Sequence, residues 1–192
     1  MSHQIQTTKA FVINSHERGE ADKMFVLYTE LLGLVYVDAK GIRKESSKLR
    51  SFLNSTGLFV AELLPVRSGY RIVGASGTHS MSEFLSSENR AAFARILNLF
   101  SKLVYNSLKD EKLFYILSDS HNLLVSAEFE DVESLECVCV ARMLERLGYF
   151  PRDKSPLIFE NSIEVVKQRL RDVNTRRKVI SEINEIMYEL HS

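Results

Sequence analysis

Cysteine is nearly absent from this sequence. The two that occur, Cys137 and Cys139, are separated by one residue inside a helical pattern. On a helix, side chains at this spacing point about 200° apart, so we expect no disulfide between them. A structural zinc site needs four ligands, usually supplied as two close pairs, and no further cysteine could complete one. We therefore expect two buried thiols and a reducing, cytoplasmic setting.

Long apolar runs are also missing. No run approaches the roughly 20 residues that a helix needs to cross a bilayer. The first four residues lack both the positive start and the apolar core of an export signal, so we expect no export. With 45% hydrophobic and 26% charged residues among 192, the composition is typical of a soluble globular chain of one large or two small domains.

Catalytic and phosphate-loop patterns are lacking as well. The five histidines are scattered, and none has a carboxylate or a second histidine at ligand spacing. Residues 118–121 (SDSH) contain types used in acyl transfer but no glycine-flanked nucleophile elbow. Gly69, Gly74 and Gly77 match neither of the common phosphate-binding loops. We therefore expect a protein that is not an enzyme and that uses no cofactor.

What the first 76 residues do contain is short β-type runs. Strands are expected at residues 7–14, 24–32, 34–39, 58–64 and 70–75. Residues 15–22 are interpreted as a connection, residues 40–50 as a polar loop, and Pro65 as the end of the fourth strand. Five short strands with tight connections fit a small closed barrel. A half-open antiparallel sheet fits the periodicity nearly as well.

Helical periodicity replaces this pattern after residue 81. Apolar residues at i, i+3, i+4 and i+7 predict helices, and they place them at residues 88–107, 113–125, 132–147, 162–170 and 176–190. Gly148 and Pro151 are expected to stop the third helix. The fold class is therefore α+β, with a β-barrel domain at residues 1–78, an all-α domain at residues 79–192, and a boundary near Gly77.

Charge is balanced overall but not locally. The chain has 25 basic and 25 acidic residues; residues 1–72 hold ten basic and seven acidic, and residues 73–192 hold fifteen and eighteen. Residues 38–50 contain two acidic residues and five basic ones, which are Lys40, Arg43, Lys44, Lys48 and Arg50. Such a local patch predicts modest, strongly salt-sensitive affinity for nucleic acid.

This basic loop is the best candidate for a functional site. Tyr36 lies just upstream and could stack on a base, and arginine can grip phosphate oxygens with two hydrogen bonds. The alternative is a solvated loop whose lysines only protect a sheet edge. A second basic run at residues 167–178 is most simply explained as the solvent-exposed face of a helix. It could also extend a DNA track or receive an acidic peptide.

Several motifs together resemble one family. They are AFVI at residues 10–13, GEADK at 19–23, LYT at 27–29, Gly33, KGIRK at 40–44 with Ser47 and Leu49, and VARMLERLGYFP at 140–151. This combination resembles the bacterial recombination mediator family RecO. Strong matches cover about a quarter of the chain, and their order agrees along most of its length.

The resemblance implies an N-terminal OB-fold and a C-terminal helical domain. It also implies binding of single- and double-stranded DNA, annealing of complementary strands, and help in loading RecA onto strands coated by single-strand binding protein. Implied partners are RecR and the acidic C-terminal tail of that coating protein, in a cytoplasmic, nucleoid-associated setting. Residues 152–160 lack the zinc-binding cysteines of many members, so a short form without zinc is expected.

The sequence thus favours a non-enzymatic RecO-like DNA-binding and annealing protein. We expect Lys40, Arg43, Lys44, Lys48, Arg50 and Tyr36 to contact DNA. For the acidic tail, we expect a pocket formed by four residues of the third long helix, namely Arg142, Leu144, Arg146 and Leu147. The alternative is a protein-interaction adaptor whose barrel has lost its DNA role.

Overall fold

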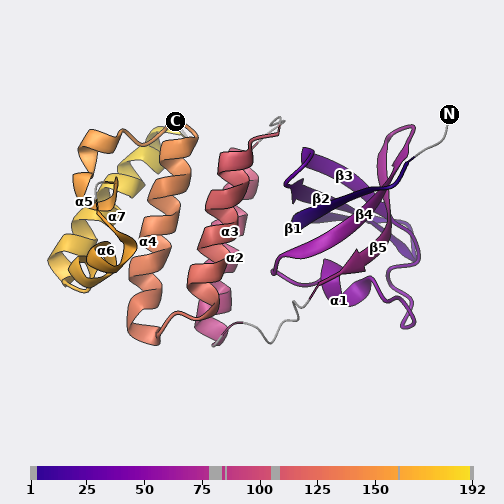
Figure 1. The fold of residues 1–192 in the computed structure, drawn as a ribbon, viewed down its shortest axis with the longest axis horizontal. Coiled ribbons are helices and arrows are strands. Elements are labelled where there is room, and N and C mark those ends of the chain that lie inside the picture. Colours follow the sequence, from indigo (N-terminus) through magenta and orange to yellow (C-terminus); the bar gives the residue numbers. More distant parts are fainter. Residues whose placement is uncertain (1–3, 78–83, 85, 105–108, 160, 191–192) are drawn as a thin grey trace. The chain divides into compact units, whose positions relative to one another are not determined.

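A computed structural model describes residues 4–77, 84, 86–104, 109–159 and 161–190 (Figure 1). The chain forms two compact units: residues 1–83 with 97–114, and residues 84–96 with 115–192. Two helices therefore contribute to both units. The expected domain boundary after residue 78 lies outside the described residues and stays a prediction.

The first unit is built on a closed five-stranded barrel. Its strands are β1 (Gln6–Arg18), β2 (Asp22–Thr29), β3 (Gly33–Ala39), β4 (Phe59–Val66) and β5 (Gly69–Ser76). They close in the order β1-β2-β3-β5-β4. Neighbouring strands are antiparallel except β3 and β5, whose short parallel pairing completes the barrel. This confirms the predicted OB-like barrel over the half-open sheet.

The strand ends differ from the prediction at three places. Residues 15–18 continue β1, paired with β2, because an exposed two-stranded ribbon needs no apolar face. Pro65 lies within β4 and not at its end, near the last pairs, where a missing N–H costs little. Residues 30–32 form a turn, because the Thr29 hydroxyl accepts from the Leu32 N–H at 3.0 Å and donates to the Gly33 carbonyl at 3.0 Å.

The barrel buries side chains on both of its faces. Its interior is filled by apolar residues from all five strands, including Phe25, Leu27 and Phe59. On the outer face, Phe11 and Tyr28 are also fully buried. The Tyr28 ring lies 4.8 Å from Phe100 and 6.2 Å from Phe114, centroid to centroid, and Phe11 lies 5.8 Å from Phe114. Residues 97–114 thus complete the first unit.

The longer helices follow the predicted apolar spacing. They are α2 (Ser87–Leu103), α3 (Glu111–Val125), α4 (Phe129–Arg146), α6 (Ile163–Leu170) and α7 (Val173–Glu189). The end of the first expected helix, residues 105–107, lies outside the described residues. Three short helical segments were not predicted: α1 (Arg50–Leu53), η1 (Arg152–Lys154) and α5 (Pro156–Phe159). Segments of three or four residues are too short for a periodic signal.

Buried polar contacts fasten the second unit. The Asn89 amide donates to the carbonyls of Leu124 (2.9 Å) and Ala127 (2.7 Å), which closes the end of α3. Cys137 and Cys139 are free and buried on α4, as predicted. None of the helices in the described part of the chain combines the length and hydrophobicity that a membrane span requires.

Candidate nucleic-acid interface

The basic loop, residues 40–50, runs from the end of β3 to the first residue of α1 and is held in a defined conformation. Gly41 has φ 64°, and its N–H donates to the Asp22 carboxylate at 2.7 Å. Ile42 is only 2% exposed and anchors the loop in the barrel core. Two further turns follow, in which the N–H of Lys44 bonds to Gly41 (3.1 Å) and the N–H of Ser47 to Lys44 (3.0 Å). The loop therefore presents its cations from a fixed backbone.

All five predicted cations of the basic loop are exposed, but they are not equivalent. Arg43 is paired with the Glu17 carboxylate and also donates to the Glu20 carbonyl at 3.2 Å. Among the described residues, no ion pair joins Lys40, Lys44, Lys48 or Arg50 to an acidic group. Four of the five are thus open to an external anion.

Two arginines of the basic loop line a small hollow of about 140 Å³, together with a residue of β2 and the residue that follows α1. Its lining consists of Lys23, Ile42, Arg43, Arg50 and Asn54. We call it the cationic hollow. Sequence reasoning missed Lys23 and Asn54. A signal for Lys23 existed: the tight turn before Gly33 sets the hairpin register, and that register places Lys23 opposite Ala39, beside the start of the loop.

Tyr36 lies apart from this hollow, on the outer face of β3. It is 45% exposed, which leaves its ring open to a stacking partner. The turn between β4 and β5 passes close by, since a Cβ atom added at Gly69 would lie 2.9 Å from the Tyr36 carbonyl oxygen. Arg67, exposed in that turn, is a second cation that sequence reasoning missed.

Acidic side chains accompany these cations. Asp38, two residues after Tyr36 on the same face of β3, is paired with Arg18. Glu17 contacts Lys23 at 3.2 Å in addition to Arg43. Part of the positive charge is therefore compensated within the barrel, which agrees with the neutral charge of the whole chain.

The residues expected to hold an acidic tail do not form one surface. Leu144 is fully buried in the core, so it cannot line an open pocket. Arg146 is exposed, and Arg142 and Leu147 are half-buried. Leu144 lies within the motif at residues 140–151, but the helical period of α4 turns its side chain into the core.

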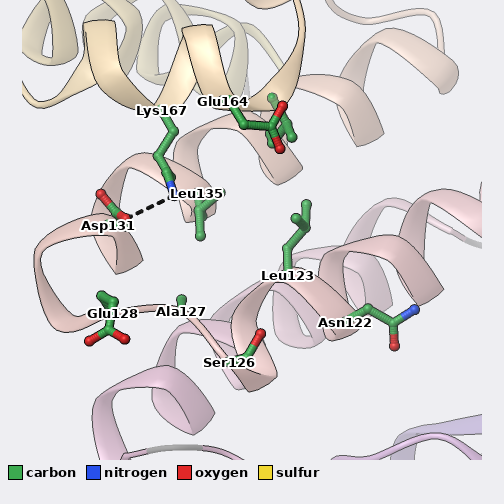
Figure 2. Close-up of a pocket in the computed structure, with 10 residues that line it drawn as sticks. Asn122, Leu123, Ser126, Ala127, Glu128, Asp131, Leu135, Glu164 and Lys167 are labelled. Atoms are coloured by element: carbon green, nitrogen blue, oxygen red, sulfur yellow. Dashed lines mark ion pairs between the residues drawn. The ribbon is translucent and has the colours of Figure 1, made fainter.

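A separate hollow of about 290 Å³ lies where α3, α4 and α6 meet (Figure 2). Leu123, Ala127, Leu135 and Ile163 supply its apolar lining. Figure 2 shows Lys167 reaching from α6 toward Asp131 on α4, with the Nζ and Oδ2 atoms 3.1 Å apart. The four residues predicted for the tail pocket are not part of this lining.

Comparison with known proteins finds relatives that match the first part of the barrel. The family described as "Recombination protein O N terminal" matches residues 1–60. This region contains β1 to β3, α1 and the whole basic loop. The chain is also 29% identical over 104 residues to DNA repair protein RecO of Dehalococcoides mccartyi, a match that covers 54% of this chain. Residues 1–60 of the chain thus resemble the N-terminal region of the RecO family.

Other RecO proteins match over a longer stretch. DNA repair protein RecO of Syntrophobacter fumaroxidans is 24% identical over 148 residues, or 75% of this chain. That of Alkaliphilus metalliredigens is 23% identical over 145 residues, again 75% of the chain. The matched part covers 40% of the Dehalococcoides RecO and 57% and 58% of the other two. The chain thus spans about half the length of the relatives it matches.

Proposed function

We propose that this chain is a RecO-family protein that binds DNA through its barrel and acts in recombinational DNA repair. The observation that carries the proposal is the basic loop, whose backbone is fixed and which keeps four cations unpaired within the described chain. The loop lies inside the part that matches the recombination protein O family. A loop whose backbone is already ordered loses less conformational freedom on binding, and its cations suit a repeated phosphate backbone.

The proposed mechanism is non-enzymatic. Lys40, Lys44 and Lys48 neutralise phosphates, while Tyr36 stacks on a base of a single strand. Because the barrel compensates part of its charge, the contacts are weak enough for two bound strands to shift until they pair. We propose annealing of complementary strands and help in loading RecA as the activities of this surface.

The first test replaces the three open lysines of the basic loop. We expect Lys40→Glu/Lys44→Glu/Lys48→Glu to weaken binding of a fluorescent single-stranded oligonucleotide and to slow annealing of its complement. If each lysine makes one phosphate contact, the slope of log affinity against log salt should fall by about 0.7 per contact, or about 2 in total.

The matched control is Lys102→Glu/Lys112→Glu/Lys154→Glu, which makes the same charge change at three exposed lysines outside the barrel strands. The control should retain the native slope. An unchanged slope in the loop variant would contradict the proposed site.

The proposed partners are RecR and the acidic tail of single-strand binding protein. Arg142 and Arg146 on α4 stay the candidates for the tail, since both reach the surface at least in part. We expect a fluorescent acidic peptide to bind and Arg142→Ala/Arg146→Ala to weaken that binding several-fold. Undiminished binding by the double variant would remove these two residues from the proposal.

A protein-interaction adaptor is the second candidate. It is favoured by two ion pairs within the barrel that occupy cations, Arg18 with Asp38 and Arg43 with Glu17. It is also favoured by Phe129, which is 76% exposed at the start of α4 in the second unit. Absence of oligonucleotide binding even at low salt would place this candidate first.

A further inference from the structure

Glu17 makes an unusual pair of contacts next to the cationic hollow. It lies near the end of β1, directly opposite Lys23 on β2. One oxygen of its carboxylate is 3.2 Å from the Lys23 Nζ, and the other contacts the Arg43 guanidinium. Both cations line the hollow, whereas Glu17 does not. An internal anion thus bridges two of the three cations of that site.

The hollow has the chemistry of a site for one small anion. Lys23, Arg43 and Arg50 supply positive charge, and the Asn54 amide supplies further donors. At about 140 Å³ it is well below the roughly 300–1,000 Å³ of pockets that enclose a drug-sized ligand. A phosphate group offers more oxygen acceptors than a carboxylate and can reach all three cations together.

We propose that Lys23, Arg43 and Arg50 form a seat for a single phosphate group, and that the Glu17 carboxylate is a built-in competitor for it. The phosphate can belong to a DNA backbone, in which case the inference rests on the proposed function, or it can be free phosphate. Glu17 then sets the affinity of the seat by competing with the incoming anion.

The surroundings make this exchange feasible. The Glu17 side chain is 59% exposed, and exposed ion pairs are weak, so an external anion can displace it. Arg43 keeps two other contacts when Glu17 leaves: its guanidinium bonds to the Glu20 carbonyl and its N–H to the Ala21 carbonyl, each at 3.2 Å. The seat therefore stays formed during the exchange.

Glu17→Gln removes the competing charge and keeps the size of the side chain. Glu45→Gln is the matched control: it removes one charge from the basic loop itself, and no ion pair joins Glu45 to a cation in the described part of the chain. Inorganic phosphate is titrated into each protein, with the backbone amide signals of Gly41 and Arg43 followed by NMR. We expect about fivefold tighter phosphate binding in Glu17→Gln than in the native chain or the control.

A second arm titrates a single-stranded oligonucleotide into the same three proteins. Tighter binding of both ligands in Glu17→Gln supports the seat and its use for DNA. Tighter phosphate binding without any oligonucleotide binding supports the seat and contradicts the proposed function. Equal phosphate affinity in Glu17→Gln and Glu45→Gln overturns the seat, even if the oligonucleotide binds in a salt-dependent way.

Discussion

Asp131 shows how a single residue joins two helices of the second unit. It lies on α4 and is only 2% exposed. Its carboxylate accepts hydrogen bonds from Lys167 of α6, at 3.1 Å, and from Arg171, which directly follows α6, at 2.8 Å. The hydrogen bond from Arg171, supported by Lys167, holds the pKa of Asp131 below its ordinary value, although burial opposes this shift. The charged form is therefore the form that stabilises the fold.

Replacing Asp131 with asparagine should destabilise the protein in a pH-dependent way. We expect a loss of about 1–3 kcal/mol in the free energy of unfolding at neutral pH, because a buried charged acceptor is removed. A group with a lowered pKa stabilises the fold fully above its ordinary pKa, about 4, and loses this effect as the pH falls through the folded value.

Urea unfolding of both proteins at pH 7 and below pH 4 checks the expectation. The gap in stability between native protein and variant should narrow progressively as the pH falls below about 4 toward the folded-state pKa of Asp131. Asp153→Asn, at an exposed carboxylate of η1, serves as the control. A gap that is as wide in acid as at neutral pH would argue against the ion pair as the cause.

The end of α4 shows what a single turn contributes at the level of an element. Gly148 has φ 83° and donates to the Glu145 carbonyl at 2.9 Å, while the Tyr149 N–H bonds to Leu144 at 2.9 Å. Nothing lies within 4 Å of a Cβ atom placed on Gly148. Any cost of a side chain there therefore comes from the left-handed backbone alone.

We expect Gly148→Ala to lower the free energy of unfolding by about 1 kcal/mol, since alanine disfavours this conformation. Gly148→Asn should cost less, because asparagine tolerates it better. Thermal unfolding of both variants measures the difference. An alanine variant as stable as the native protein would show that the helix can end in another way.

The sequence predicted elements best where their signal is local. The apolar spacing of α2, α3 and α4 placed these helices within a few residues, and Gly148 marked the end of α4 correctly. The ribbon at residues 15–18 was missed because both of its faces are polar. In the candidate site, the exposed cations of the basic loop were evident from the sequence. Which of them is paired with an acidic side chain was not.

At the scale of the whole molecule, the decisive contacts join residues far apart in the chain. Tyr28 packs on Phe100 and Phe114, and no sequence window of a strand or helix reveals this pairing. The division into a barrel and a helical part was evident from the change in periodicity. The assignment of residues 97–114 to the barrel unit was not.

The cationic hollow is likewise formed by residues far apart in the chain, so no single sequence window predicts it. It combines β2 with the loop and with the residue that follows α1, and Glu17 reaches it from β1. Charge counting identified a basic segment, whereas the competing carboxylate depends on the strand register. The proposed site thus combines a local sequence signal, the basic loop, with contacts from other strands that no local pattern predicts.

The buried thiols on α4 have a practical consequence for fluorescence work. Burial raises the pKa of Cys137 to about 12 and that of Cys139 to about 11, and maleimide dyes react with the thiolate. Both native cysteines should therefore stay unlabelled in the folded chain near neutral pH. A cysteine introduced at the exposed Ser46 would carry the only dye, directly on the basic loop, without a cysteine-free background.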